Sequence, residues 1–334
     1  MDLPDPAPPR EDRASVTAPR VEAVVVVQDT TDRLDEVLTS LVAQDYPRFG
    51  VVALVSADDE EVEAAVARSA PRAEIRKVGD AGGFGTAADH VLDNTSPPAF
   101  YLLCHQDAAL ASDVLRLLVE EAIRSNASIA GPKLVDWDNP ERLVDVGLDV
   151  DKLGHDVSRV EPGELDQEQH DAVVDVFAVP QGVQLVRGDL FHALEGFDPT
   201  MDIVGGDVDF CWRSHVAGAR VMVVPSAVAR VPEHGRTESS SGEFERTRER
   251  NRVRMILTVY GIGHSIRVIP QGLLYTLFRS LGALLVGQFG LSRAAAGAWV
   301  WNAMRPGALY QRRRKVRETR KIPDSEIRPL QVRG

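Results

Sequence analysis

Residues 21–27 read Val-Glu-Ala-Val-Val-Val-Val, a short and nearly continuous run of apolar, mostly β-branched side chains. Such a run is typical of a strand that is buried on both faces, as the strands of parallel sheets are. From Thr31 onward, apolar residues recur at helical spacing, so a helix is expected to follow the strand. A buried strand followed by a helix predicts the opening unit of an alternating β-α fold.

The same alternation continues along the chain. Strands are predicted at 51–55, 75–78 and 100–104, and helices over 60–68, 82–92 and 112–124. Beyond residue 129 the patterns predict strands at 131–134, 176–186 and 221–224, and helices over 207–217 and 243–260. This order is typical of an α/β domain with a doubly wound, mostly parallel sheet, which binds its ligands at the carboxyl ends of the strands.

The composition limits the class of protein. The 334 residues are 44% hydrophobic, enough for one large domain with an appendage, or for two domains. A net charge of −12 argues against a nucleic-acid partner. Cys104 and Cys211 do not form a disulfide framework, so reduced, packed thiols and a cytoplasmic location are expected. Residues 1–20 are rich in Pro, Asp and Arg, lack a signal-peptide core and are expected to be disordered.

The C-terminal part has a different character. Two apolar stretches, 268–278 and 281–291, are interrupted by charged or polar residues, and no run reaches the roughly 18 uncharged residues of a membrane span. We expect two amphipathic helices that pack on the domain, form an oligomer interface or lie in a membrane interface. Trp299, Trp301 and the basic tail favour the membrane interface, and burial in the core is an equal alternative. The basic tail at 305–321 is by itself more typical of a solvated helix face than of an anionic membrane surface. The expected divisions are 1–20, 21–260 (the α/β domain), 261–321 (helical region) and 322–334 (tail).

Two acidic clusters lie about a hundred residues apart. Asp107 ends the run Leu-Leu-Cys-His-Gln-Asp at 102–107, and Asp207 and Asp209 lie in Gly-Gly-Asp-Val-Asp at 205–209. A buried strand that delivers a carboxylate to the sheet edge can hold a divalent metal against a diphosphate. A second carboxylate at a helix start can take a proton from a hydroxyl. Sugar transfer from a nucleoside-diphosphate donor needs both.

Several sequence pieces occur in a characteristic order. They are 41–47 (Leu-Val-Ala-Gln-Asp-Tyr-Pro), 83–88 (Gly-Phe-Gly-Thr-Ala-Ala), the strand that ends at Asp107, 131–134 (Gly-Pro-Lys-Leu), 196–199 (Gly-Phe-Asp-Pro), 207–209 with Trp212 and Arg213, and His234. With these pieces, residues 21–260 resemble the family 2 glycosyltransferases of the GT-A fold, and within them the actinobacterial cell-envelope members.

The resemblance implies roles for three residues at the reaction centre. Asp107 and His234 stand where the family binds Mn²⁺ or Mg²⁺, and Asp207 stands where it has its catalytic base. The chain departs from the family at Gln106 and Gly206, because acidic residues are usual at both positions. These departures remove negative charge next to the predicted metal and base.

The resemblance also implies two binding regions. On the donor side it points to Asp29, Ser56 or Asp58, Gly82, Gly83, Gln106 and Lys133, although Lys133 could equally point to solvent. Val55 stands where the family has an Asp that reads the base. On the acceptor side it points to Gln181, Gly182, Asp209, Trp212 and Arg213, of which the last three could instead orient or brace the base.

The implied function is inverting, metal-dependent transfer of a sugar from a nucleoside-diphosphate sugar to a cell-envelope glycan or a lipid-linked acceptor, by an enzyme on the inner face of the plasma membrane. The alternative is a weakened or non-catalytic GT-A domain that binds nucleotide sugar or serves as an assembly module. A nucleotidyltransferase or a nicotinamide oxidoreductase would need a Gly-rich loop after the first strand, where 28–31 read Gln-Asp-Thr-Thr.

Overall fold

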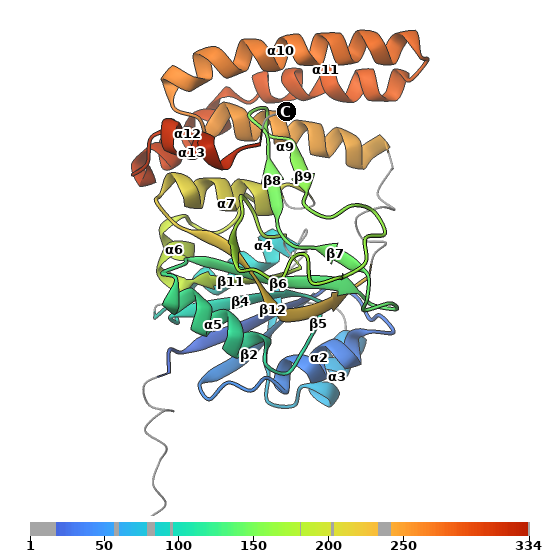
Figure 1. Ribbon diagram of the computed structural model, residues 1–334, viewed down its shortest axis with the longest axis vertical. Coiled ribbons are helices and arrows are strands. Elements are labelled where there is room, and N and C mark those ends of the chain that lie inside the picture. The colour runs from blue at the N-terminus through green and yellow to red at the C-terminus, as the bar shows by residue number, and fades with distance from the viewer. Residues whose placement is uncertain are drawn as a thin grey trace, which may run out of the picture.

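The computed structural model describes residues 18–56, 60–78, 84–93, 96–180, 182–201, 204–232 and 242–332 (Figure 1). The predicted alternation is present. Strands β1 (Val21–Val27), β2 (Phe49–Ser56), β3 (Glu74–Val78) and β4 (Phe100–His105) are parallel, and β1 lies between β2 and β4. The expectation of disorder for residues 1–20 falls largely outside the described ranges.

The sheet continues beyond β4 with a change of strand direction. Strand β11 (Val183–Arg187) pairs antiparallel with both β4 and β6 (Ile129–Asp136), and β6 pairs in parallel with β12 (Val221–Val231). Shorter strands complete the sheet: β5 (Ala109–Leu110), β7 (Leu143–Asp145) and β10 (Val174–Asp175). The mostly parallel α/β sheet predicted from the sequence is thereby confirmed.

Alternating side chains of β1 serve two hydrophobic cores, since successive residues of a strand point to opposite faces of the sheet. Val25 packs with α2 (Leu34–Val42), α3 (Glu60–Ser69) and α5 (Val114–Arg124) on one face. Val24 packs on the other face with α4 (Phe84–Ala88), α6 (Gly188–Ala193) and α7 (Gly206–Val216). A short 3-10 helix, η1 (Asp89–Asp93), follows α4. Both cysteines are free and buried, and burial raises the pKa of each thiol to about 12.

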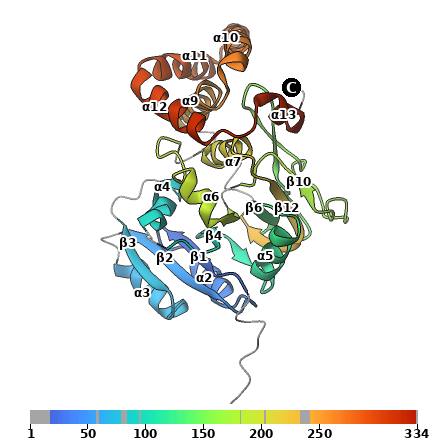
Figure 2. The same ribbon diagram turned by 90° about the vertical axis from the view of Figure 1, so that its left-hand side faces the viewer.

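A helical layer covers one end of this domain (Figures 1 and 2). It contains α9 (Gly242–Thr258), α10 (Ile262–Leu285), α11 (Phe289–Ala303), α12 (Pro306–Thr319), α13 (Asp324–Ile327) and the 3-10 helix η2 (Arg328–Leu330). Helix α9 packs against α10, α11 and α12, so the layer includes a helix that the sequence analysis placed in the α/β domain. A hairpin of β8 (Leu148–Val150) and β9 (Asp156–Ser158) extends from the sheet toward α9 (Figure 1).

The expectation of separate helices in 268–278 and 281–291 is wrong. Helix α10 contains the first stretch and continues into the second as far as Leu285, and α11 begins at Phe289, near the end of the second stretch. Arg279 is accommodated inside this helix because its guanidinium group pairs with the buried Glu249 of α9. Among the described residues, α10 is the one helix long and apolar enough by composition to cross a membrane, and Arg267 and Arg279 divide it into uncharged runs shorter than 18 residues.

Candidate active site

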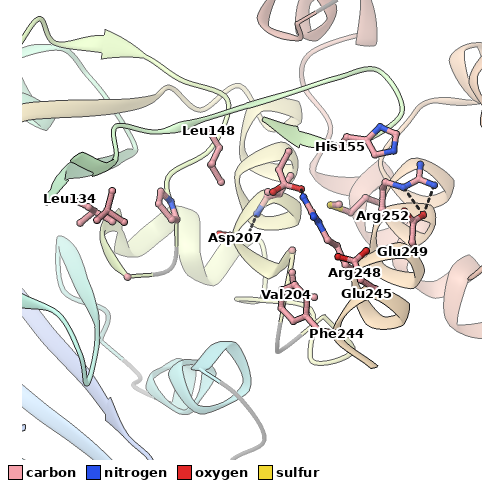
Figure 3. Close-up of a pocket in the computed structure, with 18 of the residues that line it drawn as sticks. Leu134, Leu148, His155, Val204, Asp207, Phe244, Glu245, Arg248, Glu249 and Arg252 are labelled. Atoms are coloured by element: carbon pink, nitrogen blue, oxygen red, sulfur yellow. Dashed lines mark hydrogen bonds and ion pairs between the residues drawn. The ribbon is translucent and has the colours of Figure 1, made fainter. Parts of the chain in front are cut away.

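A cavity of about 550 Å³ lies between the carboxyl edge of the sheet and the helical layer. Asp107 and Asp207 both line it, although they are far apart in the sequence. Figure 3 shows Leu134 on one side of the cavity, Arg248, Glu249 and Arg252 of α9 on the other, and Asp207 between them. The fold therefore brings the two predicted carboxylates into one site.

Asp107 lies just beyond the end of β4. The strand registers pair Val26 of β1 with His105, so the residues after His105 extend past the paired part of the sheet. A tight turn follows, in which the amide of Ala108 donates to the carbonyl of His105 at 3.1 Å. The Asp107 side chain is 25% exposed, and its Oδ2 lies 3.5 Å from Nδ1 of His105. Burial lowers the pKa of His105, against the opposing effects of Asp107 and Asp29, which favours a neutral imidazole.

Gln106 joins the ends of β4 and β1. Its Oε1 accepts hydrogen bonds from the backbone amides of Gln28 at 2.6 Å and Asp29 at 3.3 Å, and its Nε2 donates to Oδ1 of Asp29. A carboxylate at position 106 could not donate to Asp29 and would repel it. The hydrogen bond to Asp29 therefore explains why this position has a Gln and not an acidic residue.

Asp207 lies in the first turn of α7. The preceding Gly205 has a φ of +82°, a conformation that glycine adopts without the steric cost of a side chain. The amide of Val208 donates to Oδ1 of Asp207 at 2.8 Å, and Asn251 of α9 donates to the carbonyl of Val204 at 2.7 Å. These contacts fix the start of α7 beneath α9. The positive end of the helix dipole at this position stabilises a carboxylate.

Three residues predicted to bind the acceptor lie in the interior instead. Asp209, Trp212 and Arg213 are 0%, 0% and 2% exposed and do not line the cavity. Asp209 accepts hydrogen bonds from Nε of Arg213 at 2.7 Å and from Nη2 of Arg312 at 3.0 Å. An acceptor cannot contact these side chains in this conformation, so their position fits the alternative prediction, that they brace the helix that carries Asp207.

Lys133 also has protein partners. Its ammonium group lies 2.7 Å from Asp166 and 2.6 Å from Asp171, and the residue is 5% exposed. It neither points to solvent nor lines the cavity, so its predicted contact with the donor would require these ion pairs to open.

The other predicted site residues are described in part. Asp29 is exposed at the end of β1, and Gly182 lines the cavity, where its carbonyl accepts from the amide of His105 at 3.0 Å. Only the backbone of Ser56 is described. Five predicted residues lie outside the described ranges: Asp58, Gly82, Gly83, Gln181 and His234.

The sequence does not reveal the wall of the cavity that faces the helical layer. Arg248 and Glu249 of α9, His155 of the β8–β9 hairpin and Tyr275 of α10 line it. Arg248 pairs with Asp156 at 2.9 Å, and Arg252 donates to Glu249 at 2.8 Å and to the carbonyl of Leu153 at 2.9 Å. These contacts hold the hairpin against α9. The charges of α9 were the only available signal in the sequence, and they do not reveal which side of the helix faces the site.

The described residues offer a partial metal site. No group of three or more His, Cys, Asp or Glu side chains within the described ranges is arranged to hold an ion. Asp107 supplies a carboxylate that lines the cavity, and His105 an adjacent neutral imidazole. Mg²⁺ commonly binds through one or two carboxylates, and waters and substrate phosphates complete its coordination. The available ligands are therefore compatible with a divalent ion that binds together with a diphosphate.

Solved structures share this fold. GalNAc-T7 with UDP, GalNAc and Mn²⁺ has a TM-score of 0.56 at 13% identity, over 74% of this chain and 49% of that chain. The mannosyltransferase PcManGT from Pyrobaculum calidifontis in complex with GDP-Man and Mn²⁺ has a TM-score of 0.51 at 17% identity, over 87% and 77%. TarS from S. aureus has a TM-score of 0.50 at 15% identity, over 75% and 42%. This chain thus spans about half of the first of these proteins.

These similarities show the GT-A fold predicted from the sequence. A comparison with curated proteins gives no match. The family model described as "Glycosyltransferase like family 2" matches residues 19–254, which is more than half of the chain and includes both cavity carboxylates. The chain therefore belongs to the family 2 glycosyltransferases.

Proposed function

We propose that this glycosyltransferase is an inverting, metal-dependent enzyme that transfers a sugar from a nucleoside-diphosphate sugar to a cell-envelope glycan or a lipid-linked acceptor. The observation that carries the proposal is that Asp107, just after β4, and Asp207, in the first turn of α7, line one cavity. A site at the carboxyl edge of an α/β sheet is the usual position for nucleotide ligands.

Asp207 acts as the base in this proposal. It takes the proton of the acceptor hydroxyl while the hydroxyl oxygen forms a bond to the anomeric carbon of the donor sugar and the bond from that carbon to the diphosphate breaks. The nucleoside diphosphate leaves with the electron pair of the broken bond, and the configuration at the anomeric carbon inverts. The N-terminus of α7 and the contact between Asn251 and Val204 hold the carboxylate in place.

Asp107 and, next to it, His105 would hold Mn²⁺ or Mg²⁺. When bound, the metal would neutralise charge on the diphosphate leaving group. The tip of β1, with Asp29, is held against Gln106 and borders the donor side. Two similar proteins, GalNAc-T7 and PcManGT, have been solved with UDP or GDP-Man together with Mn²⁺, which supports this assignment of donor class and metal. We place the enzyme in the cytoplasm, peripheral to the inner face of the plasma membrane.

Calorimetry with UDP, GDP and dTDP, each with and without Mn²⁺, tests the proposal. We expect one nucleotide to bind in a metal-dependent manner, and Asp107→Ala to weaken this binding at least tenfold in the presence of Mn²⁺. The matched control is Asp45→Ala, because the Asp45 side chain is 79% exposed on the protein surface. Absence of binding by all three nucleotides, or equal binding by the wild type and Asp107→Ala, would contradict the proposal.

A further inference from the structure

We propose that the outer face of α10 binds a membrane surface that contains anionic lipids. This outer face consists of large apolar side chains on α10 and at the start of α11 that are between 54% and 82% exposed: Ile266, Leu274, Leu277, Phe278, Leu285 and Phe289. Soluble proteins rarely expose a continuous apolar surface of this extent unless it binds a partner or a membrane. In Figure 1, α10 is the outermost layer at its end of the molecule.

The outer face is not a part of the domain core that was left unpacked. The opposite side of α10 is already packed, with Val268, Gly272 and Thr276 buried. Trp299 of α11 donates from Nε1 to Oγ1 of Thr276 at 2.9 Å, and Arg279 pairs with Glu249 of α9. Helix α10 is therefore attached to the protein by its inner side, and its apolar outer side is accessible to a membrane.

The charge distribution identifies the partner. Residues 250–317, from α9 to α12, contain twelve Lys or Arg residues and no Asp or Glu, in a chain whose net charge is −12. Arg252, Arg254 and Arg312 are buried and Arg279 pairs with Glu249, which leaves eight cations that are partly or fully exposed. Arg267 on α10 and Arg293 on α11 are exposed beside the apolar side chains. Exposed cations flanking an apolar helix face are typical of helices that lie in the interface of an anionic bilayer. A purely apolar protein partner would not require this exclusion of acidic residues.

The packing favours a helix that lies on the membrane over one that crosses it. The length of α10 would suffice for a span, but its inner side is attached to α9 and α11 and carries the ion pair between Arg279 and Glu249. A spanning helix would have to abandon these contacts, whereas an interfacial helix keeps them and exposes only its outer face to lipid.

The same helix forms part of the cavity, and this consequence rests on the proposed function. Tyr275 and Arg279 of α10 line the cavity that contains Asp207, and Tyr275 is also 39% exposed. A membrane under α10 would therefore lie next to the cavity. This arrangement favours a lipid-linked acceptor, whose polar head can reach Asp207 while its apolar chain stays in the bilayer.

Vesicle flotation of the full chain tests the inference. We expect the protein to float with phosphatidylcholine vesicles that contain about one third phosphatidylglycerol at low salt, and to bind less as the salt concentration rises. The double variant Leu277→Glu and Phe278→Glu should reduce the partition coefficient at least tenfold. The matched control is Ile123→Glu, since Ile123 is 56% exposed on α5, far from α10 (Figure 1). A wild type that does not float, or a double variant that floats equally well, would overturn the inference.

Two further measurements distinguish membrane binding from misfolding of the variants and from self-association. Leu285→Glu, at the end of α10, introduces a single charge where no packing is lost, so weaker flotation with unchanged thermal unfolding excludes misfolding as the cause. Light scattering without vesicles should give a monomer; a dimer that the double variant dissociates would assign the outer face to self-association and overturn the inference. Nucleotide calorimetry is independent of both, so a protein that binds nucleotide but not vesicles contradicts this inference alone.

Discussion

The carboxyl edge of the sheet and the helical layer next to it distribute charge in opposite ways. At the sheet edge, Asp107 and Asp207 face a cavity whose walls also contain apolar side chains, among them Leu134 and Leu148. In the helical layer, Arg312 is buried against Asp209, while Phe278 on the outer side is 68% exposed. The edge is organised to receive a polar ligand. The layer is held to the domain by buried charges and directs its apolar surface outward.

The largest effect on stability is expected from Asp209→Ala, which breaks the charged contact between α7 and α12. The variant leaves the guanidinium groups of Arg213 and Arg312 buried without their shared carboxylate. Removing one partner of a buried ion pair typically costs about 3–5 kcal/mol of unfolding free energy. Urea unfolding followed by circular dichroism measures the loss.

An exposed ion pair on the same helix provides the control. Arg314 pairs with Glu318 on α12, and the two side chains are 68% and 59% exposed. Arg314→Ala should leave the unfolding free energy nearly unchanged, because solvent screens such pairs. If Asp209→Ala costs no more than Arg314→Ala, buried charge does not hold the helical layer in place.

Gln106→Glu tests the opposite region, the edge of the sheet. The change removes the amide that donates to Asp29 and places a second carboxylate beside it. We expect a loss of about 1–3 kcal/mol in unfolding free energy, the usual cost of leaving a partly buried polar group without its partner. Gln167→Glu, on an exposed loop, should have no measurable effect. An unchanged or higher stability of Gln106→Glu would show that an acidic residue fits this position as well as Gln does.

A change of pH is expected to have a smaller effect on the unfolding free energy. Burial lowers the pKa of His215, whose Nε2 lies 2.9 Å from the carbonyl oxygen of Phe177. The unfolded chain, with a pKa near 6.5, then binds a proton more readily than the folded chain. The contribution of neutral His215 to the unfolding free energy is therefore fully present above about pH 6.5 and is lost as the pH falls below this value.

His215→Gln should accordingly flatten the fall in unfolding free energy between pH 7.5 and pH 5, whereas His90→Gln, on an exposed residue, should leave the wild-type slope. Equal slopes in all three proteins would contradict the assignment of the buried His215 as a source of acid sensitivity.

The sequence predicted the α/β domain well because its signals are local. The β-branched run at 21–27 and the helical spacing after Thr31 each specify an element without reference to distant residues. The helical layer was harder. Arg279 suggested a break between two helices, and only the three-dimensional contact with Glu249 explains why α10 continues through it.

The residues of the site also divide into those that local sequence signals predict and those that only packing reveals. Asp107 and Asp207 could be predicted because each follows a recognisable strand or glycine-rich turn. The burial of Asp209 could not, since it depends on Arg312, which is distant in the sequence and belongs to a tail that also suggested a solvated face. Arg248 and Tyr275 were missed for a similar reason: only packing shows which side of α9 or α10 faces the cavity.

The most direct test of the account is the turnover of Asp207→Asn. The reaction is measured as release of nucleoside diphosphate from the nucleotide sugar whose nucleotide binds best, with isolated membranes as the source of acceptor. We predict a rate about 10²–10⁴-fold below that of the wild type, the usual contribution of a general base, with nucleotide binding and thermal unfolding unchanged. Asp45→Asn should keep the wild-type rate. An Asp207→Asn variant that turns over at the wild-type rate would contradict the assignment of Asp207 as the base.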